Sequence, residues 1–266
     1  MNNKKISVIT VVKNGMPFLK KAVKSFKLQD YLNKELIIIY SNSDDDTENY
    51  VKSLKDKNII VQQDEKSSTR YGSIINGINI SNGEIFGLLH SDDIFHNEKV
   101  LSQIEREFNS EYDCIYGNIL FCDKKNINSI NRKWISSKFN IEQLKFGWTP
   151  PHTSIFLKKN YFTKNSDIYN EKFKISGDYY FILKLFNDKN LKIKYLNIFI
   201  TIMRTGGDST KLNNVLEKFK EDLNISKLFF KNYFFCVLLK IFRKISQLQV
   251  FKKKIYSDYL NKINLN

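Results

Sequence analysis

The segment Gly83-Glu84-Ile85-Phe86-Gly87-Leu88-Leu89-His90-Ser91-Asp92-Asp93-Ile94-Phe95 joins an apolar run of strand length to two adjacent carboxylates. Such a run predicts a strand buried in a sheet, so Asp92 and Asp93 emerge together where the chain leaves that sheet. In open α/β sheets, ligands bind at such strand ends. The pair suits a hard divalent cation, Mg²⁺ or Mn²⁺, which takes one or two carboxylates plus substrate phosphate oxygens. The alternative is that one of the two only caps a helix beginning near Asn97.

Apolar runs and helical stripes alternate ahead of this segment. Ile6–Val12 and residues 36–39 and 59–61 are rich in β-branched side chains, which predicts strands buried on both faces. Two sets of apolar residues between the runs recur at helical spacing: Phe18, Ala22, Val23 and Phe26, then Ile74, Ile75 and Ile78. This alternation predicts an α/β fold with a doubly wound, mostly parallel central sheet.

The alternation loosens in the second half of the chain. Residues 112–121, 153–157 and 193–203 predict further strands, while residues 123–140 are polar and predict an exposed excursion or flap. Asp178 falls in the first turn of a predicted helix. That helix has its apolar side chains at helical spacing, namely Phe181, Ile182, Leu185 and Phe186.

The chain is strongly basic, with 43 Lys and Arg residues against 28 Asp and Glu residues and a formal charge of +15. This charge points to an anionic partner, and alone it does not choose among nucleotide phosphates, nucleic acid and an acidic membrane surface. Cys114, Cys122 and Cys236 lack the close spacing of a zinc site or a disulfide framework, which fits a reducing cytoplasmic compartment. No uncharged apolar stretch approaches the ~20 residues that span a bilayer, so we expect no transmembrane helix.

Residues 211–266 predict a basic amphipathic helical segment at the C-terminus. Residues 227–254 contain eight basic residues and no acidic one. One helical face carries Leu238, Ile241, Phe242, Ile245 and Leu248, and another carries Lys240, Arg243, Lys244 and Gln247. Such a helix either lies in an anionic membrane interface or packs its apolar face on its own domain, and the sequence leaves both open.

Three groups of residues, taken in order, resemble the family-two, inverting glycosyltransferases of the GT-A fold. They are Thr10-Val11-Val12-Lys13-Asn14, the loop residues Ser43, Asp45 and Thr47, and the segment from Gly83 to Asp93. The resemblance runs from Ile6 to about Ser209. It implies a catalytic domain over residues 1–210, with a donor half at about 1–95 and an acceptor half at about 96–210.

The resemblance also implies roles for individual residues. Thr10 and Asn14 would lie at the donor nucleotide, and Asp92 and Asp93 would serve the ribose, the diphosphate and a Mn²⁺ or Mg²⁺ ion. Asp178, in Ser176-Gly177-Asp178-Tyr179, resembles the acidic residue that acts as the catalytic base of the family.

Two further elements resemble the bacterial cell-surface polysaccharide branch of the family. They are Pro151-His152-Thr153 and Gly206-Gly207-Asp208-Ser209, which make His152 and Arg204 candidates for the acceptor side or the phosphate side. For His152, a hydrogen-bonded structural histidine below the site is the favoured alternative.

Two positions depart from the family pattern. Tyr40 stands where an acidic residue usually reads the donor base, and aromatic stacking could replace that contact. His90 stands where many members have the first Asp of an Asp-x-Asp motif, so metal binding rests on Asp92 and Asp93.

The function that the resemblance implies is transfer of a sugar from a nucleotide-sugar to a hydroxyl of a glycan or lipid-linked acceptor. The pathway would be synthesis of a capsule, O-antigen or lipooligosaccharide, on the inner face of the cytoplasmic membrane, with an anionic membrane surface and no nucleic acid as partner. The alternatives are a non-enzymatic basic protein that binds membrane or nucleic acid, and a nucleotidyltransferase. A nucleotidyltransferase would have a Gly-rich basic phosphate loop after the first strand, and Lys13-Asn14-Gly15-Met16-Pro17 is not such a loop.

Overall fold

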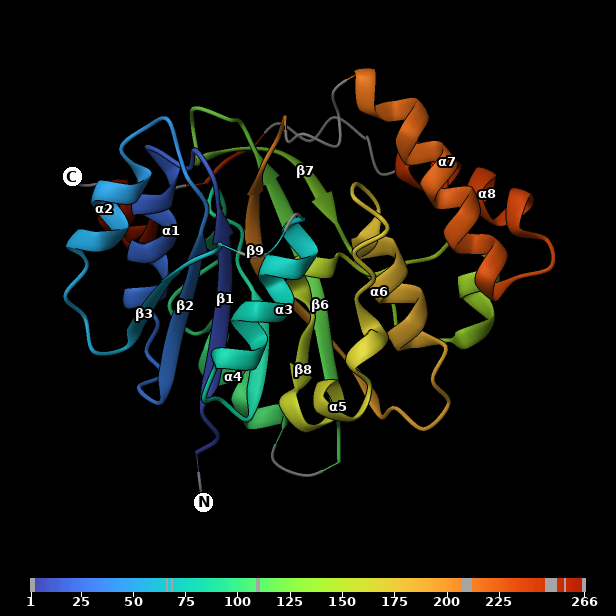
Figure 1. Cartoon of the computed structure of the whole chain (residues 1–266), viewed down its shortest axis with the longest axis horizontal. Coiled ribbons are helices and arrows are strands. Elements are labelled where there is room, and N and C mark those ends of the chain that lie inside the picture. Colours follow the sequence, from blue (N-terminus) through green and yellow to red (C-terminus); the bar gives the residue numbers. More distant parts are fainter. Residues whose placement is uncertain are drawn as a thin grey trace.

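A computed structural model describes residues 3–65, 67, 69–108, 111–206, 212–246, 253–255 and 257–264. Helices cover both faces of one central sheet (Figure 1). The predicted α/β class with a mostly parallel central sheet is confirmed. The candidate segment Gly207-Asp208-Ser209, together with Gln247 and Leu248 of the predicted C-terminal helix, lies outside the described residues.

The parallel part of the sheet contains four strands in the order β4-β1-β2-β3. Their bounds are Ile6–Val12 for β1, Lys34–Tyr40 for β2, Ile59–Gln63 for β3 and Ile85–Leu88 for β4. Because these strands are parallel, their carboxyl ends lie at one edge of the sheet. The loops after β1, β2 and β4 therefore meet there.

Alternate residues of β1 and β2 point to opposite faces of the sheet, as the two-residue period of a strand requires. Val8 and Ile38 pack with helices α1 (Phe18–Lys27), α2 (Thr47–Ser53) and α4 (Val100–Glu107). Ile9 and Ile37 pack with α3 (Arg70–Ile80), α5 (Lys159–Lys164) and α6 (Gly177–Phe186). The two-sided burial explains why these strands are almost wholly apolar.

The second half of the sheet contains antiparallel pairs. Its strands are β5 (Ile94–Phe95), β6 (Cys114–Cys122), β7 (Ser129–Trp134), β8 (Phe156–Lys158) and β9 (Ile193–Arg204). β8 joins β4 to β6 with antiparallel pairing on both sides, and β9 runs parallel to β6. The long β6–β9 pair therefore supports the part of the molecule that contains Asp178.

Three expected boundaries are corrected. Residues 123–140 do not form an exposed flap throughout, because β7 pairs with β6 and buries Ile130 in a small cluster beside β6. The strand expected at 153–157 begins at Phe156, after a 3₁₀ turn at His152–Ser154. The helix expected near Asn97 begins at Val100.

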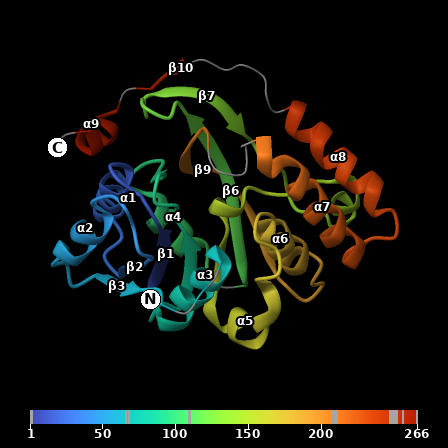
Figure 2. The same ribbon diagram turned by 45° about the horizontal axis from the view of Figure 1, so that its top comes forward.

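The C-terminal segment crosses most of the molecule. Helices α7 (Leu212–Phe229) and α8 (Tyr233–Ser246) form a hairpin beside α6 (Figure 1). The short strand β10 (Lys253–Lys254) then pairs with β7, and α9 (Asp258–Asn264) packs on α1 (Figure 2). In α9, the Tyr259 hydroxyl donates to the Phe95 carbonyl at 3.1 Å. The segment is helical as expected, with one added strand.

Candidate active site

A cavity of about 680 Å³ lies where the ends of β4, β6 and β9 meet α3, α6, α7 and α8. Its volume is in the range that holds a small-molecule substrate. Its wall combines aromatic and aliphatic side chains with ionisable ones. The ionisable ones include His90, His152 and Asp178, and the cations Arg70, Arg132, Arg204, Lys218, Lys240 and Lys244.

Asp92 and Asp93 emerge together after β4, as the sequence predicts. Asp93 is only 1% exposed, and its Oδ1 accepts the Arg204 backbone N–H at 3.1 Å. Its Oδ2 is buried, receives no hydrogen bond within the described part of the chain, and lies 3.5 Å from His90 Nδ1. Burial raises the pKa of Asp92, and burial followed by the neighbouring charge of Asp92 raises the pKa of Asp93 well above its usual value.

These residues fit a divalent cation. Ligand atoms of His90, Asp92 and Asp93 all lie within 4.8 Å of one another. A cation would supply the missing partner of Asp93 Oδ2 and would favour the ionised form of both carboxylates. The structure thus adds His90 to the two predicted ligands, since imidazole nitrogen also binds transition metals such as Mn²⁺.

Asp178 lies in the first turn of α6, as predicted, and is linked to the metal-side carboxylates by two histidines. Its Oδ2 lies 3.8 Å from His152 Nδ1, and His152 Nε2 lies 3.2 Å from His90 Nε2. Burial alone would raise the pKa of Asp178. The positive charges of His152, Lys218, Lys240 and Lys244 outweigh that effect and lower the pKa to about 2. Asp178 is therefore a carboxylate at neutral pH, and His152 lies in the cavity wall between the two halves of the site.

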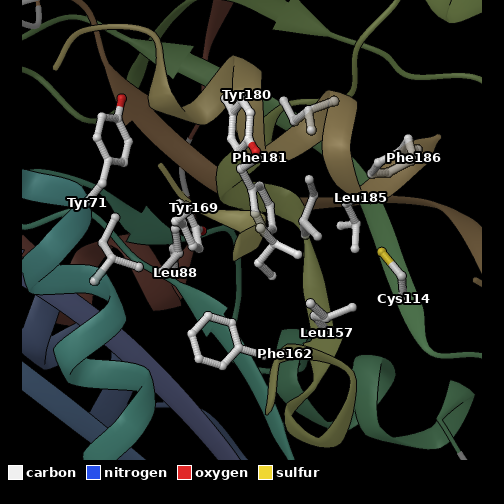
Figure 3. Close-up of a cluster of buried hydrophobic side chains, with 14 of the residues drawn as sticks. Tyr71, Leu88, Cys114, Leu157, Phe162, Tyr169, Tyr180, Phe181, Leu185 and Phe186 are labelled. Atoms are coloured by element: carbon white, nitrogen blue, oxygen red, sulfur yellow. The ribbon is translucent and has the colours of Figure 1, made fainter. Parts of the chain in front are cut away.

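Packing against α3 fixes the helix that carries Asp178. The rings of Tyr169 and Phe181 stack at 4.4 Å between centroids, and Tyr71 stacks on Tyr169 at 6.2 Å (Figure 3). A Cβ atom on Gly177 would lie 2.5 Å from the Tyr71 ring, so only glycine allows this close approach.

Glu221 of α7 holds the segment that precedes α6, a contact that the sequence did not predict. Its carboxylate accepts the backbone N–H groups of Lys174, Ile175 and Ser176 at 2.9, 3.0 and 2.7 Å. These groups precede α6, where a carboxylate also interacts favourably with the helix dipole. No local pattern indicates this contact, because it joins residues about 45 positions apart.

Three predicted donor residues are placed differently from one another. Asn14 is exposed at the end of β1, with its backbone in the left-handed region (φ 52°), and its side chain bonds to Asp44 in the loop after β2. Thr10 is 1% exposed, and its hydroxyl donates to the Leu89 carbonyl at 2.8 Å. Tyr40 is 5% exposed and packs in the core cluster shared with α1 and α2. Thr10 therefore supports the chain before Asp92, and Tyr40 presents no open ring face for stacking.

Two polar side chains lie next to Tyr40. Gln63 Nε2 donates to Asn42 Oδ1 at 2.9 Å, and both lie on the exposed surface at the carboxyl ends of β3 and β2. An amide pair of this kind offers both donors and acceptors to a base.

Arg204 lies on the metal side of the cavity. Its Nη1 donates to the Lys124 carbonyl at 3.0 Å, and its guanidinium lies 4.6 Å from the centre of the Phe18 ring. Its charge acts on Asp92 and Asp93. Arg204 therefore lies on the same side of the cavity as Asp92 and Asp93.

Solved structures share this fold. TarS of S. aureus (residues 1–349, in complex with UDP-GlcNAc) superposes with a TM-score of 0.65 at 16% sequence identity, over 84% of this chain and 65% of that one. The mannosyltransferase PcManGT of Pyrobaculum calidifontis, in complex with GDP-Man and Mn²⁺, gives a TM-score of 0.58 at 11% identity, over 94% of this chain and 67% of that one. The chain therefore has a GT-A-type α/β fold.

The chain belongs to Glycosyl transferase family 2, whose model matches residues 7–192. An uncharacterised glycosyltransferase of Rickettsia conorii is 29% identical over 192 residues, which cover 68% of this chain and 31% of the relative. A Campylobacter jejuni protein named GalNAc(5)-diNAcBac-PP-undecaprenol beta-1,3-glucosyltransferase is 33% identical over 128 residues, which cover 47% of this chain and 41% of the relative. The chain thus spans less than half the length of either relative.

Proposed function

We propose that this protein transfers a sugar from a nucleoside-diphosphate sugar to a hydroxyl of a glycan or lipid-linked acceptor, with inversion at the anomeric carbon. The observation that carries the proposal is the position of one ionised carboxylate, Asp178, in the wall of a cavity that His90 also lines, where His90 is grouped with Asp92 and Asp93. Family membership and the named activities of relatives support the same reaction. Its setting would be bacterial cell-surface polysaccharide synthesis, such as capsule, O-antigen or lipooligosaccharide.

The two ends of the cavity have complementary chemistry. Asp178 accepts the proton of the acceptor hydroxyl while the oxygen of that hydroxyl forms a bond to the anomeric carbon. The bond from that carbon to the diphosphate oxygen breaks on the opposite face, and the diphosphate leaves with the electron pair. A Mn²⁺ or Mg²⁺ ion held by Asp92, Asp93 and His90 would stabilise the negative charge on the leaving group.

A donor screen tests this function. UDP-, GDP-, CMP- and dTDP-sugars are each incubated with the protein, Mn²⁺ and a panel of glycan and lipid-linked acceptors. One donor should raise the melting temperature, and its nucleotide should be released faster with an acceptor than without one. If every donor fails to bind and to react, the proposal is wrong.

We also propose that α8 attaches the protein to an anionic membrane surface, the inner face of the cytoplasmic membrane. The helix packs on its own domain through Cys236, Val237 and Lys240. Four of its large apolar side chains are exposed, namely Phe234, Phe235, Ile241 and Phe242, the last 63% exposed. Exposed Arg243 lies among them, so this face combines aromatic and cationic groups as an interfacial helix does. Within the described residues, no helix is both long and apolar enough to span a bilayer.

Vesicle sedimentation tests the attachment. The full chain should bind vesicles that contain anionic lipid, and high salt should release it. Changing Phe235 and Phe242 to Ser should reduce the bound fraction severalfold. The control Leu32→Ser removes a side chain that is 87% exposed on another part of the surface. Equal binding by the α8 variant and the control would contradict the attachment.

A further inference from the structure

The positive charge in the cavity wall is divided between its two ends. Arg204, Arg70 and Lys124 act on Asp92, at the metal side. Lys218, Lys240 and Lys244 act instead on Asp178, at the opposite end. The first group is placed to meet the diphosphate of a donor. The second group comes from the α7–α8 hairpin, at the end of the cavity opposite the donor diphosphate, so its positive charge indicates a second anionic ligand.

Within the described part of the chain, only some of this second charge is balanced. Lys240 is buried, pairs with Asp222 at 2.8 Å, and lies 3.3 Å above the Tyr179 ring. Among the residues that the structure describes, no carboxylate lies within 4.0 Å of Lys218 or Lys244. Burial, together with the charges of Lys240 and Lys218, lowers the pKa of Lys244 to about 8. An ammonium group kept there without a counter-ion is costly, and a bound anion would relieve the cost.

A further cation in the cavity wall comes from the sheet. Arg132 of β7 lines the same cavity with its guanidinium 3.5 Å above the Phe121 ring. Its Nε is buried and, within the described residues, has no hydrogen-bond acceptor. A buried donor of this kind favours a ligand that brings an oxygen to it.

We propose that Lys218 and Lys244, in the wall of the cavity that Arg132 also lines, bind a phosphate group of the acceptor, so that the enzyme acts on a phosphate-bearing acceptor. The inference rests on the proposed function, because the acceptor must lie at Asp178. Cations from separate elements suit a group with several charged oxygens, whereas one guanidinium can satisfy a carboxylate with two parallel hydrogen bonds. The phosphate belongs either to a lipid carrier or to a glycan phosphodiester.

Binding of this phosphate would also prepare the base. Without a bound phosphate, the charge of His152 and then the charges of the three lysines lower the pKa of Asp178 to about 2, which makes it a weak proton acceptor. A phosphate on Lys218 and Lys244 cancels part of that charge, so the pKa of Asp178 rises toward its ordinary range. The base is then strongest when the acceptor is bound.

A smaller cavity offers a path for the rest of the acceptor. It measures about 200 Å³ and is lined by Trp148, Arg243 and residues that also line the main cavity, including Lys240 and Lys244. Arg243 lies on α8 among the exposed apolar residues. A phosphate at Lys244 would therefore lie between Asp178 and the surface that we propose to contact lipid.

Thermal shift with phenyl phosphate tests the phosphate site. The full chain is first saturated with Mg²⁺ and the nucleoside diphosphate that stabilises it most, which fills the donor site. Phenyl phosphate should then raise the melting temperature further. Its affinity should fall about 10- to 100-fold in the double variant Lys218→Gln/Lys244→Gln, the loss typical of removing strong charge-assisted hydrogen bonds. The control Lys227→Gln, an exposed lysine of α7, should bind like the wild type.

The result can separate this inference from the proposed function. Failure of every nucleoside diphosphate to bind refutes the function. Binding of the nucleotide without any further effect of phenyl phosphate refutes the phosphate site, as does equal affinity in the double variant and the control. Tighter binding of glucuronate than of phenyl phosphate also overturns the inference, because it makes the ligand a carboxylate. Farnesyl phosphate and glycerol 3-phosphate, compared in the same way, assign the phosphate to a lipid carrier or to a glycan.

Discussion

Glu221→Gln should loosen the start of α6 and so displace the carboxylate of Asp178, the proposed base. Glu221 accepts three backbone N–H groups at 2.7 to 3.0 Å. Hydrogen bonds to a charged group contribute about 1.5–3 kcal/mol each. Glutamine keeps one acceptor oxygen and turns an NH₂ group toward the backbone donors, so it loses at least one bond and the charge. We expect a loss of about 2 kcal/mol in the free energy of unfolding.

A loss of this size should be measurable by calorimetry as a melting temperature lower by about 4–8 °C, given the slope for domains of this size. Turnover should fall, while the affinity for the nucleoside diphosphate stays near that of the wild type because the donor half is untouched. Glu217→Gln is the matched control, since Glu217 lies one turn earlier on the same helix and is exposed. If Glu221→Gln matches this control in both stability and turnover, α7 does not position Asp178.

Three further changes probe other parts of the site. Asp92→Asn should lower turnover ~10²–10³-fold, and full activity in excess chelator would refute the metal role. The kcat/KM for the acceptor should fall as the pH rises through about 8, because the Lys244 ammonium then loses its proton and its charge. The charged groups around Lys244 are Lys240, Lys218, Asp178 and Asp222. Lys244→Gln should remove this step from the pH profile. Asp222→Asn should destabilise the fold by about 3 kcal/mol in chemical denaturation, since it leaves the buried Lys240 unpaired, and an unchanged midpoint would contradict this.

The sequence predicts those features that depend on local patterns. The run Ile6–Val12 is apolar and β-branched on both faces of a strand, so it favours burial on both sides, which is typical of a parallel strand. Asp92 and Asp93 directly follow an apolar run, so their emergence at a strand end is also local. Asp178 precedes an apolar stripe at helical spacing, which is sufficient to place it in a first turn.

Features that depend on long-range packing were not predictable. The two-residue period of a strand predicts which face of the sheet carries Tyr40. It does not predict that α1 and α2 cover that face and bury the Tyr40 ring in the core. Helical spacing puts Lys240 and Lys244 on one face of α8, but it does not indicate that this face turns inward to Asp222 and the cavity. The polar composition of residues 123–140 gives no strand signal for β7, because a strand near the edge of a sheet needs few apolar side chains on its solvent-facing side.

The rate of acceptor-dependent nucleotide release by Asp178→Asn tests most directly whether Asp178 is the general base. Asparagine keeps the size of the side chain and removes the proton acceptor. We predict a rate ~10²–10⁴-fold below that of the wild type, the usual contribution of a positioned base, with nucleoside diphosphate affinity and melting temperature nearly unchanged. A rate near that of the wild type, or a joint loss of nucleotide affinity and stability, would contradict the assignment of Asp178 as the base.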